Sequence, residues 1–242
     1  MSREGALGFL YPGYAAEDDY PYLAGAVEPP VRAEVVHTLF DEDAHTVAAL
    51  SEMGSLPRIL EGAERLAPRG PEAVVWSSTS ASFVLGWEGA RGQAEALERA
   101  LGVPASTTAL AFVRAAGALG TRRVAVAATY PEDIAEWFVE FLGGGGVEVL
   151  RAGSRGIVTA AEVGTLGREE VVGFVAENDH PEAGALLVPD TALHTARWLG
   201  DLEAAVGKPV LTANQVTFWE AMRISGRLRP REGLGELFRL AT

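Results

Sequence analysis

The chain has no cysteine among its 242 residues. Disulfide bonds, thiolate nucleophiles and cysteine-ligated metal sites are therefore excluded. No apolar run approaches the roughly 20 residues that a membrane-spanning helix needs, so we expect no membrane partner. The first residues, MSREGALGFLYPGY, carry charge ahead of a short strand-like run, which is not the pattern of a signal peptide. We therefore expect a cytoplasmic protein.

Basic residues are few relative to acidic ones. The chain has 20 Lys and Arg against 33 Asp and Glu, which gives a net charge of −13. This charge argues against nucleic acid as a partner, because the phosphate backbone is anionic. A small anionic substrate is still compatible with it, because backbone N–H groups can bind an anion locally. The four histidines lack metal-ligand spacing such as H-E-x-x-H, so we predict no metal.

Short apolar runs rich in β-branched residues alternate with helix-forming runs along the whole chain. Strands are expected at 6–11, 31–40, 73–76, just after Pro104, and at 123–128, 147–152, 185–188 and 210–212. Helices are expected between them, including one that starts at Asp43 or Thr46 and runs to about Leu66 with an interruption near Pro57, and one over 191–206. Such alternation predicts an α/β fold with parallel sheets and helices on both faces.

An internal duplication is indicated by three pairs of similar segments that occur in the same order. The pairs are Gly8–Asp18 with Val124–Asp133, Glu72–Gly86 with Gly184–Gly200, and Gly102–Phe112 with Gly207–Phe218. They predict two similar lobes related by a pseudo-twofold axis, one of residues 1–108 plus 213–242 and the other of residues 109–212. The simpler alternative is that any α/β protein repeats strand–turn–helix units.

Two predicted strands end in polar residues at corresponding places in the duplication. The stretch VVWSSTSASF passes from a buried strand to the hydroxyl residues Ser77–Ser80, and ALLVPDT ends a strand at Asp190. Active sites of parallel α/β folds lie beyond the carboxyl ends of the strands. We therefore expect Asp190 and the cluster Ser78–Ser80 to line one pocket between the lobes. The alternative for both stretches is a plain helix N-cap.

The turns SSTSASF, ATYPED and LLVPDTALHT, followed by PVLTANQVTFWEAMR, together resemble the aspartate/glutamate racemase superfamily. The resemblance is greatest to its maleate isomerase and arylmalonate decarboxylase branch and covers almost the whole chain. It implies two lobes with parallel four-stranded sheets flanked by helices, an active-site cleft between them, and no cofactor. Members of this branch use one or two cysteines, and both cysteine positions are replaced here.

The resemblance implies a role for nine residues of this chain. Ser78 and Asp190 fall at the two cysteine positions, and Tyr130 matches a pocket tyrosine, which makes these three the candidate catalytic residues. The candidate substrate-binding residues are Thr79, Ser80, Thr191, Tyr11, Pro12 and Asn214. Ser78 is expected to be a hydrogen-bonding wall residue, because no G-x-S-x-G elbow is present to make it a nucleophile. His194 follows Asp190 by one helical turn and could orient it.

These residues favour a cofactor-independent isomerase or decarboxylase-like lyase that acts on a small mono- or dicarboxylate through an enediolate. Asp190 would be the acid or the base in place of a thiol, and the residues alone leave that choice open. One alternative is a catalytically silent relative that binds a small carboxylate in a regulatory or scaffolding role. Another is a subunit that needs a partner chain to complete its site. Apolar segments around Trp87 and Trp137 are compatible with a homodimer or larger homo-oligomer.

Overall fold

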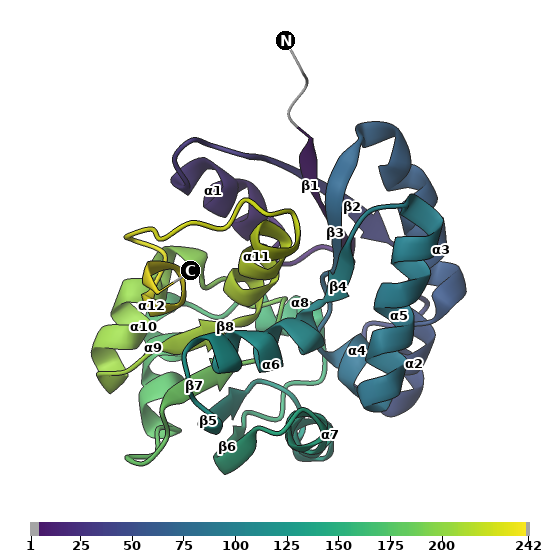
Figure 1. The fold of residues 1–242 in the computed structure, drawn as a ribbon. Helices are drawn as coiled ribbons and strands as arrows, with labels where there is room; N and C mark the ends of the chain where they lie inside the picture. Colours follow the sequence, from purple (N-terminus) through teal and green to yellow (C-terminus); the bar gives the residue numbers. More distant parts are fainter. Residues whose placement is uncertain (1–4, 241–242) are drawn as a thin grey trace.

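The computed structural model describes residues 5–240 and contains two four-stranded parallel sheets (Figure 1). The first sheet has the order β2-β1-β3-β4 and the second the order β6-β5-β7-β8. The strands are β1 (Ala6–Pro12), β2 (Arg32–Thr38), β3 (Pro71–Trp76), β4 (Ala105–Thr107), β5 (Arg123–Ala128), β6 (Glu148–Ser154), β7 (Ala185–Val188) and β8 (Val210–Thr212). The two sheets share one topology, and the predicted fold class is confirmed.

The central strands are buried on both faces, which explains their continuous apolar runs. In β3 the residues Ala73–Trp76 are inaccessible to solvent, and so are Val124–Ala128 of β5. A strand covered by helices on both sides needs apolar side chains at every position. The edge strands β2 and β6 carry polar and charged residues, because one side of each meets solvent.

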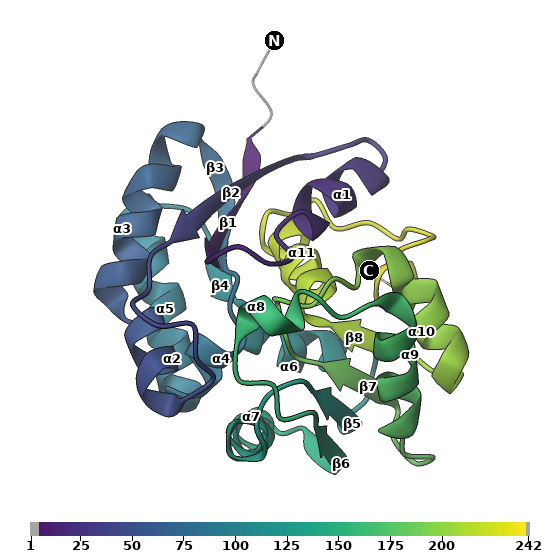
Figure 2. The same cartoon turned by 180° about the vertical axis from the view of Figure 1, so that it is seen from behind.

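Helices cover both sheets and also pack between them (Figures 1 and 2). In chain order they are α1 (Asp19–Ala26), α2 (Val47–Met53), α3 (Leu56–Leu66), α4 (Ser80–Phe83), α5 (Gly86–Leu101), α6 (Thr108–Ala118), α7 (Glu132–Gly144), α8 (Ala160–Val163), α9 (Arg168–Glu177), α10 (Leu199–Val206), α11 (Ala213–Ile224) and α12 (Glu236–Arg239). Helices α3 and α5 pack on the first sheet and α10 on the second, while α6 and α11 pack against each other in the middle. The division into two lobes at residues 108 and 213 stays a prediction.

The predicted helix over 191–206 is wrong in its first half. Residues 191–195 form turns and irregular structure, a 3₁₀ turn spans Ala196–Trp198, and α10 begins only at Leu199. The reason lies in a carboxylate that takes amides a helix would use. The Thr195 and Ala196 N–H groups, which in a helix would bond to the carbonyls of Thr191 and Ala192, donate to Asp19 instead. Side-chain acceptors of this kind compete with the helix ladder.

Two further helix predictions compare differently with the structure. The helix expected from Asp43 or Thr46 begins after Thr46, whose hydroxyl accepts the Ala49 N–H at 3.3 Å, and the interruption expected near Pro57 lies between Met53 and Leu56. The helix expected after the serine-rich turn is only one turn long, and Gly86 with a positive φ of 70° begins the next one. Left-handed backbone of this kind is readily adopted only by glycine.

No helix among residues 5–240 is long and apolar enough to cross a membrane.

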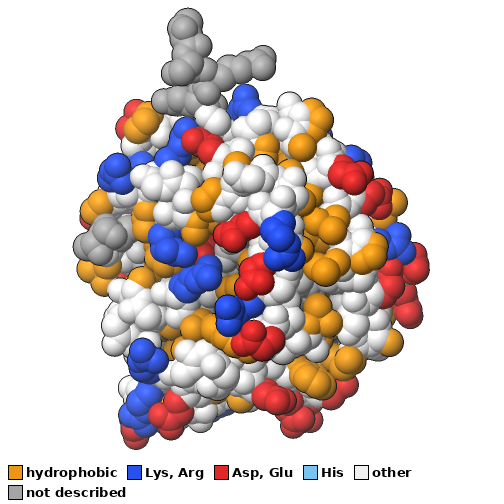
Figure 3. All heavy atoms as spheres, turned by 45° about the vertical axis from the view of Figure 1, so that its right-hand side comes forward, with side chains coloured by type: hydrophobic (Ala, Val, Ile, Leu, Met, Phe, Trp, Pro, Cys, Tyr) orange, Lys and Arg blue, Asp and Glu red, His pale blue; other side chains and the backbone are white. Residues whose placement is uncertain are grey.

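The face that carries α3 and α5 shows acidic and basic side chains interspersed with apolar patches (Figure 3). Trp137 is partly exposed, and Trp87 packs on Phe141 with 5.3 Å between ring centroids. A homo-oligomer through this region stays a prediction.

Candidate active site

A cavity of about 60 Å³ lies where the carboxyl ends of β1, β3 and β7 meet the loop between β2 and α2. Six of the nine predicted site residues line it: Tyr11, Pro12, Ser78, Ser80, Asp190 and Thr191. The two polar strand ends therefore face one space, as their sequence patterns predicted. The lining also includes Tyr14, Asp43 and His45 but no Lys or Arg, so an anion would be held by hydrogen-bond donors.

Asp190 stands at the end of β7, with only 4% of its surface exposed. Its Oδ1 accepts the Ala192 N–H at 2.9 Å, and its Oδ2 accepts the Thr129 hydroxyl. A carboxylate that accepts a hydrogen bond at each oxygen has the pattern of the ionised form. The suggested partnership with His194 is wrong, because the His194 Nε2 lies 2.9 Å from Asp18 Oδ1.

The hydroxyl groups of the turn after β3 differ in their hydrogen-bond partners and in their exposure to the cavity. Ser78 Oγ accepts the Ala81 N–H at 3.3 Å, so it caps the short helix α4. Thr79 is 1% exposed and its hydroxyl has no hydrogen-bond partner within residues 5–240. Ser80 lines the cavity directly. A buried donor without a partner is costly, so Thr79 marks a place where a ligand atom or water would be stabilised.

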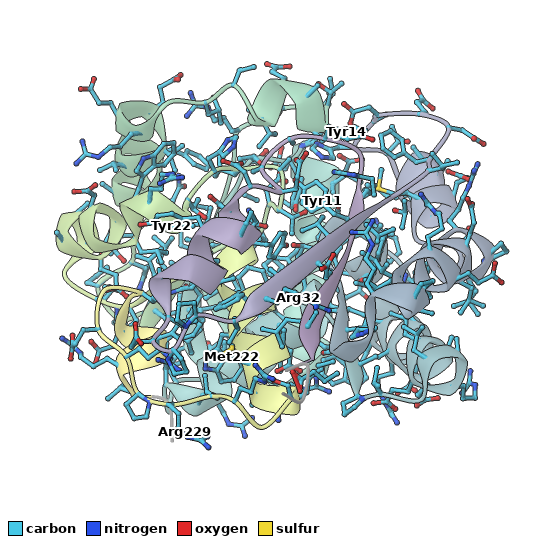
Figure 4. All side chains as sticks on the ribbon, turned by 90° about the horizontal axis from the view of Figure 1, so that it is seen from above. Tyr11, Tyr14, Tyr22, Arg32, Met222 and Arg229 are labelled. Atoms are coloured by element: carbon cyan, nitrogen blue, oxygen red, sulfur yellow. The ribbon has the colours of Figure 1, made fainter. Side chains whose placement is uncertain are left out.

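Two tyrosines hold the turn at residues 189–191 from opposite sides. The Tyr130 hydroxyl donates to the Pro189 carbonyl, and the Tyr11 hydroxyl donates to the Thr191 carbonyl at 2.9 Å. Burial raises the pKa of both phenols well above the usual value, and the nearby Asp190 charge raises them further. Both groups therefore stay neutral donors. Tyr11 of β1 and Tyr14 of the loop after it line the cavity (Figure 4), whereas Tyr130 is not part of the lining.

Asn214 is buried and is not part of the cavity lining. Its Nδ2 donates to the Thr191 carbonyl at 3.1 Å and to Asp19 Oδ2 at 3.0 Å, and its Oδ1 accepts the Tyr20 hydroxyl at 3.0 Å. These bonds connect α11 and the α1 region to the turn that carries Asp190. Together with Thr79 and Tyr130, Asn214 is one of the predicted site residues outside the lining, and their assigned roles stay predictions.

Asn214→Ala is expected to destabilise the fold by about 3 kcal/mol, because it leaves several buried partners without a hydrogen bond. Urea unfolding at neutral pH measures this. The matched control is Ser225→Ala at the end of the same helix, where a half-buried hydroxyl donates to the Met222 carbonyl at 3.1 Å. We expect the control to cost less than about 1 kcal/mol. An equal loss of unfolding free energy in the two variants would contradict the role given to Asn214.

Asp19 was missed as a structural residue because the sequence shows it only as one of three acids in a loop. The structure buries it, with Oδ2 accepting the Thr195 N–H at 3.1 Å and the Ala196 N–H at 3.2 Å. Burial raises its pKa above the usual value, although these hydrogen bonds act in the opposite direction. The raised pKa means that ionisation of Asp19 has a cost in stability.

Asp19→Asn is expected to change how stability depends on pH. The raised pKa means that the contribution of Asp19 is complete below its unfolded pKa and is lost as pH rises through the folded value. The asparagine variant lacks this loss. Its stability relative to the wild type should therefore increase from acidic to neutral pH. Denaturant unfolding across that range measures the difference, and a constant difference would refute the assignment.

Residues from the loop before α2 also reach the cavity, which no local sequence pattern indicated. Asp43 accepts the Ala160 N–H at 2.9 Å and the Ala161 N–H at 3.0 Å. The backbone N–H of His45 donates to the Val158 carbonyl at 2.7 Å. These pairs join positions more than a hundred residues apart, so only the tertiary fold brings them together. Within residues 5–240 no group of three or more potential ligands could hold a metal.

A family model described as arylmalonate decarboxylase matches residues 26–238. The chain belongs to the arylmalonate decarboxylase family. It is 28% identical to an arylmalonate decarboxylase of Bordetella bronchiseptica over 183 residues, which are 74% of this chain and 76% of that one. The resemblance noted in the sequence is confirmed at the level of the family.

Solved structures of this family and of maleate isomerases share the fold. A liganded double mutant of arylmalonate decarboxylase superposes with a TM-score of 0.85 at 24% identity, covering 97% of this chain and 99% of that one. A maleate isomerase of Pseudomonas putida S16 superposes with a TM-score of 0.88 at 22% identity, covering 96% and 97%. At such identities the likeness speaks for the fold alone.

Proposed function

We propose that the protein is a cofactor-independent isomerase or lyase that acts on a small mono- or dicarboxylate through an enediolate. The observation that carries this proposal is the cavity between the strand ends, where the Asp190 carboxylate and several hydrogen-bond donors meet. Family membership supports a lyase or isomerase, since arylmalonate decarboxylases and maleate isomerases share this fold. The substrate class is inferred from the donors.

The donors are on the turn after β3. The hydroxyl of Thr79 has no partner, and Ser80 faces the cavity. Within residues 5–240 the backbone N–H groups of Thr79 and Ser80 also donate to no other part of the chain. These groups would hold a substrate carboxylate and then the oxyanion that develops from it. Each donor of this kind is worth about 3 kcal/mol in a transition state.

Asp190 would act as the base in place of the family thiol. Its two oxygens already accept hydrogen bonds from Ala192 and Thr129, an arrangement that suits a carboxylate and does not suit a proton donor. It would remove a proton from the carbon next to the substrate carboxylate. Tyr130 and Tyr11 would act by holding the turn that carries Asp190, and Ser78 by capping α4.

The test is incubation of the protein with phenylmalonate and with maleate in D₂O, followed by proton NMR. These acids represent the reactions of the two enzyme classes that share the fold. We expect loss of CO₂, cis–trans isomerisation or deuterium exchange next to a carboxylate, above a protein-free control. The proposal fails if neither acid undergoes any of these steps.

A catalytically silent small-carboxylate-binding protein is the second candidate, with a regulatory or scaffolding role. It is favoured by the absence of cysteine and by the occupied hydroxyl of Ser78, which leave no nucleophile at either thiol position. Calorimetric titration with the same two acids separates the candidates. Binding without turnover or exchange supports the silent protein, and turnover excludes it.

A further inference from the structure

His45 is a cavity residue that has no place in the mechanism so far. It comes from the loop between β2 and α2, and only 6% of its surface is exposed. Imidazole is the side chain best suited to carry protons near neutral pH. The question is therefore whether its ring presents a nitrogen to the cavity.

The tautomer of His45 is set by its contacts. Its Nδ1 lies 2.8 Å from the Ile157 carbonyl oxygen. A carbonyl only accepts hydrogen bonds, so Nδ1 carries the hydrogen and Nε2 holds the lone pair when the ring is neutral. The ring stands edge-on to Tyr130, with 4.9 Å between centroids and an interplanar angle of 82°. The ring is therefore fixed on two sides.

The second ring nitrogen remains available. Within residues 5–240 the Nε2 of His45 makes no hydrogen bond, and it is not one of the fully enclosed polar atoms without a partner. It is therefore accessible, and the accessible space beside this buried ring is the cavity. Asp190 is already assigned as the base. Asp43 accepts the Ala160 and Ala161 N–H groups, and the Tyr11 hydroxyl is engaged with Thr191 and Ala16, so His45 is the lining residue best placed to supply an acid.

We propose that Nε2 of His45 is the second proton-transfer group of this cavity and donates a proton to the substrate carbon next to the carboxylate. The proposal rests on the proposed function and supplies the acid that it lacks. Asp190 and His45 come from different parts of the fold, the end of β7 and the loop after β2. An acid and a base on separate elements can address a bound carbon from different directions.

The proton-transfer step balances without any added reagent. An enediolate forms when the substrate carbon loses a proton to Asp190 or loses CO₂. The Nε2–H bond of the His45 imidazolium then breaks, and the electron pair of the enediolate forms the new C–H bond. The substrate carboxylate is restored and the imidazole is left neutral. The imidazole then takes a proton from solvent, and Asp190, where it acted as the base, returns its proton to solvent.

The test uses two variants that separate the two nitrogens. In His45→Asn the side-chain amide can keep the hydrogen bond to the Ile157 carbonyl, but it has no atom in place of Nε2. In His45→Gln the amide reaches toward the Nε2 position but transfers no proton. The control is His180→Asn, because His180 lies in the loop between α9 and β7, outside the cavity lining.

We expect decarboxylation or deuterium exchange of phenylmalonate to fall at least about a hundredfold in both His45 variants. Binding of phenylmalonate and of maleate should change less than about fivefold, and added imidazole should restore part of the rate in His45→Asn. The His180 control should keep the wild-type rate. A wild-type rate in His45→Asn, with an active wild-type protein, overturns the role of His45 alone. An inactive wild-type protein overturns the proposed function and this role with it.

A measurement independent of turnover checks the geometry. Nitrogen-15 NMR of the imidazole groups should show the neutral His45 ring with its proton on Nδ1. Addition of phenylmalonate or maleate should shift the Nε2 resonance of His45 and leave that of His180 unchanged. A proton on Nε2 of the neutral ring, or no shift at a concentration where calorimetry shows binding, overturns the proposal.

Discussion

Asp190→Asn is expected to lower turnover of a carboxylate substrate by a factor of about 10² to 10⁴, the usual contribution of a general base. The asparagine has nearly the same shape, and its oxygen can still accept the Ala192 N–H. Thr129 can turn its hydroxyl to accept a hydrogen bond from the new amide, because a hydroxyl both donates and accepts. The fold should therefore survive while the base is lost. Initial rates of deuterium exchange at the carbon between the two carboxylates of phenylmalonate measure the effect.

The matched control for this substitution is Asp201→Asn on α10. Asp201 is exposed and pairs with Arg168 at 2.7 Å, outside the cavity lining. Asp201 takes no part in the cavity, and a solvent-exposed ion pair contributes little to stability. The control should therefore fold normally and keep the wild-type rate. Asp190→Asn should also bind the substrate carboxylate more tightly than the wild type does, because one negative charge leaves the cavity. Undiminished turnover in Asp190→Asn would remove Asp190 from the mechanism and leave the cavity as a binding site.

The architecture was accessible from sequence because its signals are local. The apolar runs around Val75 and Val126 mark strands that are buried on both faces, and the recurrence of similar turns at fixed order implied two sheets of one topology. Polar residues placed directly after such strands predicted that Ser80 and Asp190 would face the same space. Each inference uses residues that are neighbours in the chain, together with one general rule about where parallel strands end.

The parts that escaped prediction depend on contacts across long stretches of chain. Nothing local distinguishes Asp19 from Asp18, yet one is buried under three donors and the other pairs with His194 on the surface. The helix expected after Asp190 does not form over residues 191–195, because Asp19 accepts the Thr195 and Ala196 N–H groups. His45 owes its orientation to the Ile157 carbonyl, 112 positions further along the chain. Such pairings follow from the packing of the loops, which the sequence pattern does not specify.

Glu220 on α11 is fully buried and is bound by two arginines. Arg114 of α6 donates to its Oε1, and Arg223 of α11 donates to both oxygens at 2.7 and 3.0 Å. Arg114 also donates to Ser106 Oγ at 2.7 Å. The carboxylate therefore connects the two helices that pack against each other between the sheets. Burial acts to raise the pKa of Glu220, but the hydrogen bonds and charges of the two arginines outweigh it, and the pKa is lowered.

Glu220→Gln is expected to destabilise the protein by about 3–5 kcal/mol at neutral pH, because it removes the charge that compensates two arginines at a buried position. The lowered pKa means that the contribution of Glu220 is present above its unfolded pKa and is lost as pH falls through the folded value. The difference in free energy of unfolding between wild type and variant should therefore become smaller at strongly acidic pH. Urea unfolding at neutral and acidic pH measures it, with Glu95→Gln on the exposed face of α5 as control, where Glu95 pairs with Arg91 at 3.6 Å. A gap that is small at neutral pH, or that widens in acid, would show that this buried carboxylate is not what holds α6 to α11.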